Sequence, residues 1–225
     1  MPGGNRSRLV DLSHTIESGM ITYKGLPAPV ISDHLSRESS RSIYGPDTEF
    51  HIGRIDMVAN TGTYLDTPFH RFAEGTDLAG LVLEAVSDLE GVVVRAPASA
   101  QRAIGRAHFG ATEVRGRAVL VNTGWDVHWR TERYFTGFPH LTEDAATYLR
   151  DAGAALVGID SHNIDCTDDG MRPVHTVLLR AGIPIVEHMT NLGVLPLDGF
   201  RFSATPPKVR GMGTFPVRAH ARLDR

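Results

Sequence analysis

The chain has 225 residues, of which 41% are apolar and 22% are charged, and its formal net charge is −3 with histidine neutral. This length suits one compact domain over residues 1–225, and this composition is unlike that of a disordered chain. The weak net charge gives no electrostatic reason to expect nucleic acid or an anionic membrane as a partner.

The first predicted strand is LVDLSHTI, residues 9–16. Residues 17–49 hold few periodic apolar positions and several Gly, Pro and Ser, and they predict a long surface excursion of the kind that often covers an active site. The stretch FHIGRIDMVA, residues 50–59, alternates closely enough between residue types to predict a second strand.

Short apolar runs then follow along the rest of the chain, most of them rich in Val and Ile and bounded by Gly or Pro. They predict buried strands at residues 91–96, 116–123, 154–160, 183–189 and 200–204.

Two helices are predicted in the second half of the chain. Residues 141–153 contain Thr142 as a possible N-cap and Gly153 as a stop, and residues 174–182 again end in Gly. Each helix precedes a strand, which favours an α/β fold. No long helix separates the runs between residues 50 and 123, so part of the sheet is expected to be antiparallel.

The only cysteine is Cys166, so a disulfide framework within the chain is excluded and a cytoplasmic location is expected. The N-terminal stretch MPGGNRSRLV lacks the apolar region of a secretory signal. No run of about 18 apolar residues predicts a membrane span.

The stretch NTGTYLDTPFH, residues 60–70, ends in Asp-x-Pro-x-His. By itself this pattern is also compatible with a turn that has no chemistry. Two later residues could complete a site, because hydrolytic metal sites combine imidazole and carboxylate ligands. His175 begins a predicted helix, and Glu187 lies in an apolar strand, where a carboxylate is costly without a cation. Asp66, His175 and Glu187 form a plausible ligand set, with His70 free to carry protons.

These motifs, in this order, resemble the metal-dependent cyclase-like hydrolase family that includes bacterial kynurenine formamidase and isatin hydrolase. The family pattern His-Thr-Gly-Thr-His-x-Asp-x-Pro-x-His corresponds to residues 60–70, and DLSHTI, VGIDSHNID, VHTVLL, GIPIVEHMTNL and the closing segment FRFSATPPKVRGMGTFPVRA also match. The resemblance covers nearly the whole chain. It implies a single domain of mixed β-sheets with flanking helices, in a swivelling β/β/α arrangement, and a homodimer or larger homo-oligomer.

The resemblance also implies roles. In two-metal members, one ion is held by the two motif histidines and the motif aspartate, and the other by that aspartate with a later histidine and glutamate. The second set maps here onto Asp66, His175 and Glu187, and the catalytic histidine maps onto His70.

This sequence departs from the pattern at the first ion, where Asn60 and Tyr64 replace the two histidines. Three outcomes stay open: one ion, a first site rebuilt by another group, or no metal. His162, just past a predicted strand, is the candidate replacement ligand. His188 should point to the opposite face from Glu187 if that run is a strand, so it is left out. Tyr64 is a candidate donor to an oxyanion, and Asn60 could orient a substrate carbonyl.

The leading function is hydrolysis of a small amide, lactam or related carbonyl compound, with one divalent ion (Zn²⁺ or Mn²⁺) and His70 as general base and acid. A cyclase or lyase acting on an aromatic or polyketide-like carbonyl substrate is the closest alternative. A catalytically silent ligand-binding member is the alternative from another class.

Overall fold

The computed structural model describes residues 8–99 and 101–223, so most of the N-terminal stretch considered for targeting lies outside the described residues. Nine of the described strands form one curled mixed sheet. Their order across the sheet is β1 (Arg8–Asp11), β13 (His220–Leu223), β11 (Phe200–Ser203), β5 (Leu89–Arg95), β7 (Ala118–Asn122), β9 (Leu156–Ile159), β10 (Ile185–Glu187), β4 (Tyr64–Asp66) and β12 (Thr214–Pro216).

The centre of the sheet is parallel and both of its edges are antiparallel. Strands β5, β7, β9 and β10 run parallel to one another, and the remaining pairings are antiparallel. The predicted mixed sheet is therefore confirmed. The predicted strands at 91–96 and 116–123 pair parallel to each other, and an irregular crossover rather than a long helix joins them.

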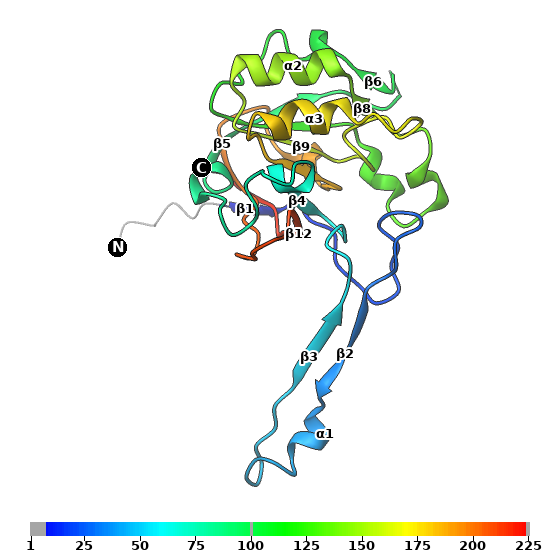
Figure 1. The fold of residues 1–225 in the computed structure, drawn as a ribbon, viewed down its shortest axis with the longest axis vertical. Helices are drawn as coiled ribbons and strands as arrows, with labels where there is room; N and C mark the ends of the chain where they lie inside the picture. The colour runs from blue at the N-terminus through cyan, green and yellow to red at the C-terminus, as the bar shows by residue number, and fades with distance from the viewer. Residues whose placement is uncertain (1–7, 100, 224–225) are drawn as a thin grey trace.

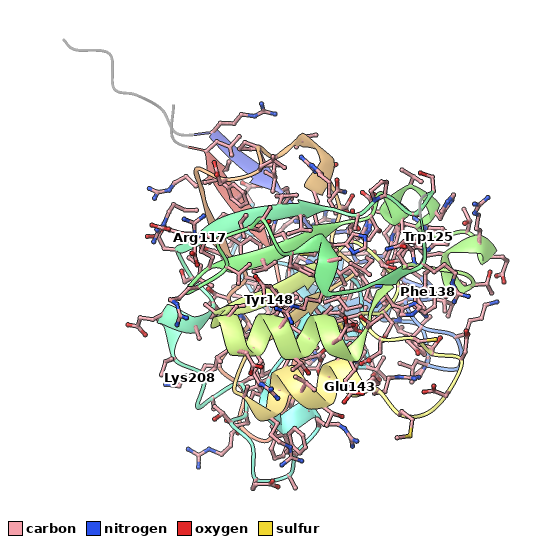
Figure 2. All side chains as sticks on the ribbon, turned by 90° about the horizontal axis from the view of Figure 1, so that it is seen from above. Arg117, Trp125, Phe138, Glu143, Tyr148 and Lys208 are labelled. Atoms are coloured by element: carbon pink, nitrogen blue, oxygen red, sulfur yellow. The ribbon has the colours of Figure 1, made fainter. Side chains whose placement is uncertain are left out.

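Helices α2 (Glu143–Ala152) and α3 (Pro173–Arg180) lie side by side over one face of the sheet, as Figures 1 and 2 show. Both predicted helices are confirmed. The C-cap of α2 is Gly153, whose φ of +83° is the left-handed conformation that glycine adopts at low cost. Thr142 occupies the N-cap position, although its hydroxyl makes no capping bond to the helix backbone.

Two apolar cores lie on opposite faces of the sheet. One packs the helices against β7 and β9 through residues such as Val119, Leu149 and Leu178. The other contains Leu65 and Val186, which lie on the strands that carry the site. All four residues of β9 are buried, as expected for a parallel strand covered on both faces.

An arm projects away from the body of the molecule in Figure 1 and consists of β2 (Val30–Leu35), α1 (Arg37–Ser40) and β3 (Ile52–Asp56). The predicted strand at 50–59 is therefore present, but it is exposed along its whole length and pairs only with β2. The surface excursion predicted for residues 17–49 contains β2 and α1.

Short elements connect these parts. They are β6 (Ala103–Ile104), β8 (His140–Leu141) and the 3₁₀ helices η1 (Pro68–His70), η2 (Leu83–Ala85), η3 (Arg106–His108), η4 (Trp125–His128), η5 (Glu132–Phe135) and η6 (Leu192–Val194). In the part of the chain that the structure describes, no helix has the length and apolar character needed to span a bilayer.

Candidate metal centre and active site

Asp66 is the last residue of β4, and its carboxylate is fully buried. In the antiparallel register on either side of β4, Ile185 of β10 and Thr214 of β12 lie opposite Asp66. The hydroxyl of Thr214 donates to Oδ1 of Asp66. Among the described residues, Oδ2 of Asp66 has no hydrogen-bond partner. A buried carboxylate oxygen without a hydrogen-bond partner is a group that a bound cation would stabilise.

His175 presents one ring nitrogen to that oxygen. It lies in the first turn of α3, where Asp165 accepts hydrogen bonds from the backbone N–H groups of Val174 and His175. Asp165 also holds Nδ1 of His175 at 2.6 Å, which leaves Nε2 facing inward. Nε2 lies 3.7 Å from Oδ2 of Asp66 and 3.8 Å from Oε1 of Glu187.

The electrostatics around His175 favour positive charge. Burial opposes protonation of the ring, but the carboxylates of Glu187, Asp165 and Asp66 outweigh burial and raise the pKa of His175 to about 10. The same surroundings that stabilise a proton on this ring would stabilise a divalent cation in its place.

Glu187 ends β10, and both of its oxygens are positioned by donors. The backbone N–H of Ile164 donates to Oε1 at 2.6 Å, and the hydroxyl of Tyr64 donates to Oε2 at 2.7 Å. Burial raises the pKa of Glu187 to about 7, although the charge of His175 acts in the opposite direction. The carboxylate predicted from its costly position in an apolar strand therefore lies beside the predicted ligands.

His70 ends η1 at the open side of the group, with 34% of its side chain exposed. Its Nδ1 lies 2.8 Å from the hydroxyl oxygen of Thr214. Potential ligand atoms of Asp66, His70 and His175 all lie within 4.8 Å of one another. Two three-residue sets can therefore hold an ion. They share Asp66 and His175, and the third member is either Glu187 or His70.

Tyr64 and Asn60 line the same pocket as Glu187. Burial and the charge of Glu187 raise the pKa of Tyr64 well above its usual value, and the side chain of Asn60 acts in the opposite direction. The single proton of the Tyr64 hydroxyl is donated to Glu187. The hypothesis that Tyr64 donates to an oxyanion needs this same proton, so the structure favours a different role for Tyr64.

Sequence reasoning left His188 out, but its ring lies in this group. Nε2 of His188 lies 3.3 Å from the Tyr64 hydroxyl, and Nδ1 lies 2.9 Å from the hydroxyl of Tyr134. The strand ends at Glu187, and His188 has a φ of +54°, so the alternation of side chains between faces does not extend to it. No signal in the sequence marks this left-handed residue.

His162 is placed apart from the carboxylates. Its ring stacks on Tyr23 at 4.6 Å between centroids and meets the edges of Phe138 and Tyr134. Burial and the charge of Lys24 lower the pKa of His162 to about 4. Among the described residues, the structure does not bring it together with Asp66 and His175 as a ligand.

A pocket of about 540 Å³ opens over these residues. Tyr23, Lys24 and Leu26, from the segment that precedes β2, line its wall. Within residues 17–49, the predicted role of covering an active site therefore applies only to this segment. Asn163 and Arg172 also line the pocket, and neither was predicted as a site residue.

Comparison with protein families gives a match to the family described as Putative cyclase over residues 10–166. A kynurenine formamidase from Bacillus cereus is 28% identical over 216 residues, which cover 96% of this chain and 98% of that protein. A kynurenine formamidase from Geobacillus thermodenitrificans is 32% identical over 174 residues, which cover 76% of this chain and 80% of that protein.

Solved structures match the fold over almost the whole chain. A potential metal-dependent hydrolase with cyclase activity has a TM-score of 0.79 and 25% identity, covering 98% of this chain and 99% of the other. Isatin hydrolase A from Labrenzia aggregata, bound to benzyl benzoate, has a TM-score of 0.81 and 20% identity, covering 97% and 94%. At this identity the isatin hydrolase supports the fold alone.

Proposed function

The chain belongs to the putative cyclase family, and from that premise we propose that it is a metal-dependent hydrolase of a small amide, lactam or related carbonyl compound. The observation that carries the proposal is the unpartnered Oδ2 of Asp66, which faces Nε2 of His175 beside Oε1 of Glu187. The name of the relatives, kynurenine formamidase, supports cleavage of a C–N bond. The similar structure named as a potential metal-dependent hydrolase with cyclase activity supports the use of a metal.

The donor set fits one divalent cation. Asp66 and His175 would be joined by Glu187, because a buried carboxylate is most stable beside a cation. Two carboxylates and one imidazole are hard to intermediate ligands, which suits Mn²⁺ as well as Zn²⁺. When bound, such an ion supplies Lewis-acid activation of water and of the substrate carbonyl.

His70 is the proposed general base and acid. The proton of the Thr214 hydroxyl goes to Asp66, so Thr214 must accept from Nδ1–H of His70. This fixes the tautomer in which Nε2 carries a lone pair. His70 takes a proton from water as the water oxygen adds to the carbonyl carbon. It then returns the proton to the leaving nitrogen as the C–N bond breaks, so the ring is unchanged after each turnover.

Asn60 and Tyr64 are proposed to serve the single-ion site. The bond from Tyr64 fixes Oε2 of Glu187, and Asn60 lies beside Tyr64 in the pocket wall. This group occupies the position where two-ion members of the family have histidines, which supports one ion rather than two.

Metal content per chain, measured by mass spectrometry on protein purified without a His-tag, tests the proposal. About one ion per chain in the wild type and none in His175→Ala is the expected result. Two ions would contradict the single site. If no ion is bound after incubation with Zn²⁺ and Mn²⁺, the metal mechanism is refuted. The catalytically silent ligand-binding protein is then the remaining alternative.

His70→Ala separates the two possible roles of His70. A general base can be lost without loss of metal, so this variant should keep its ion and lose hydrolysis of a panel of N-formyl aromatic amines, isatins and lactones. Loss of the ion would instead make His70 the third ligand.

A homodimer or larger assembly is also proposed, as the family resemblance implies. The arm supports it, because Val30, Ile31, Ile52 and Ile55 are each about half exposed on a two-stranded sheet. Light scattering should give a mass of at least two chains, and Ile55→Lys should lower it. A monomeric wild type would contradict this proposal. The cytoplasmic location stays a prediction from the single cysteine.

A further inference from the structure

The loop of residues 160–165, DSHNID, follows β9 and organises the metal centre from one side. Its Ile164 N–H donates to Glu187, and its Asp165 carboxylate fixes His175. Asn163 comes directly before these two residues. Its position is therefore set by the same backbone that sets the ligands.

The side-chain amide of Asn163 has one defined orientation. Its Oδ1 accepts a hydrogen bond from the backbone N–H of Asp165 at 2.9 Å, which identifies the oxygen end and leaves the NH₂ end for other partners. Only 6% of the residue is exposed, and it lines the same pocket as His70 and Glu187. Within residues 8–99 and 101–223, nothing accepts a hydrogen bond from Nδ2 of Asn163.

Two other donors near the pocket are already engaged. Tyr64 donates its proton to Glu187. Nη1 of Arg172 donates to the backbone carbonyls of Cys166 and Asp169. The amide of Asn163 is thus a donor that is oriented before substrate arrives, on a largely buried residue of the pocket wall.

We propose that Nδ2–H of Asn163 donates to the carbonyl oxygen of the substrate and stabilises the oxyanion that forms when water adds to the carbonyl carbon. This rests on the proposed hydrolase function and extends it by naming a catalytic residue. A neutral amide suits the position, because it does not compete with a cation for Asp66 and Glu187. A donor fixed in advance in a buried site costs no reorganisation as charge develops on the oxygen.

Asn163→Asp and Asn163→Ala test the donor. Asn163→Asp keeps an oxygen for the Asp165 N–H and removes the NH₂ group, so the loop retains its bond. Both variants should keep the metal content of the wild type and lose about 10²–10³-fold in kcat, with a smaller change in KM. Asn191→Asp is the control, because Asn191 is exposed and lies outside the pocket. It should be unaffected.

Two kinetic outcomes would overturn the proposal. An Asn163→Asp variant with kcat close to that of the wild type would exclude the donor role. Loss of the ion in both variants would assign Asn163 to maintaining the loop instead.

A second readout does not require turnover. The side-chain NH₂ resonances of Asn163, identified by their loss in Asn163→Asp, are followed in the metal-loaded protein as benzamide, an amide slow to hydrolyse, is added. A downfield shift of one of these protons supports the hydrogen bond. Shifts in His70 without a shift in Asn163 overturn the Asn163 assignment alone. If benzamide shifts neither residue, the amide pocket of the proposed function fails, and the Asn163 inference fails with it.

Discussion

Replacing Asp165 with asparagine removes the charge that orients His175 while changing only one atom. The carboxylate is fully buried, and its two oxygens accept three hydrogen bonds. Oδ1 accepts from the N–H of Val174, and Oδ2 accepts from both the backbone N–H and Nδ1 of His175. An asparagine has only one acceptor oxygen, so it cannot accept hydrogen bonds from both Val174 and His175.

The least costly orientation keeps the amide oxygen on His175 and turns the NH₂ group towards the N–H of Val174. That N–H is then buried without an acceptor, which costs about 1–3 kcal/mol of folding stability. The bond to Nδ1 also changes from charge-assisted to neutral, which weakens it by about half. Loss of such an orienting partner typically lowers metal affinity by about 10–100-fold. That corresponds to about 1.4–2.8 kcal/mol.

Chelator competition measures the affinity for Zn²⁺ and Mn²⁺, and chemical denaturation of the metal-free protein measures the stability. Asp77→Asn is a matched control, because each Asp77 oxygen also accepts a backbone N–H, from Gly80 and Gly211, in an exposed loop. The control should bind metal as the wild type does. Wild-type affinity in Asp165→Asn would refute the orienting role of Asp165, whatever the change in stability.

Three further predictions concern the same centre. Tyr64→Phe removes the donor to Glu187 and should lower metal affinity by about tenfold in a chelator competition; unchanged affinity would contradict the bond. In metal-free protein the pKa of His175 is raised to about 10 and that of Glu187 to about 7, so ion binding should release about one proton per chain near pH 8 and about two near pH 5.5. Calorimetry in buffers of different ionisation enthalpy measures the number of protons released, and equal release at the two pH values would contradict this prediction. Gly213→Ala places a Cβ 2.2 Å from the backbone nitrogen of His70, so it should displace His70 and lower turnover by about 10²-fold. A crystal structure of the variant with His70 unmoved would contradict displacement of His70 as the cause of the lower turnover.

Much of the sheet could be predicted because its central strands are buried on both faces. Strands β5, β7 and β9 read as continuous apolar runs, and the structure places each within a few residues of the predicted range. The arm could not be predicted in the same way. Its strand β3 alternates between residue types, but no face of it is buried, so the pattern carried no information about what it packs against.

The residues of the site also differ in how far the sequence could predict them. Asp66, His70, His175 and Glu187 were predicted, and the structure brings all four together. Their positions follow from motifs and from the cost of a carboxylate in an apolar strand. Asn163 was missed, although an Asn in a loop after a predicted strand often accepts from the backbone N–H two residues on, as its oxygen does here with the Asp165 N–H.

The side chains around the proposed ion are all positioned in the same way. Each candidate ligand has one atom tied to a protein donor or acceptor on its outer side. Thr214 donates to Oδ1 of Asp66, and Tyr64 donates to Oε2 of Glu187, while Nδ1 of His175 is held by a loop carboxylate. Oδ2 of Asp66 and Oε1 of Glu187 then lie within 4 Å of the free nitrogen of His175. Because the outer bonds fix the side chains before an ion arrives, a change at an outer partner should lower metal affinity as well as the stability of the metal-free fold.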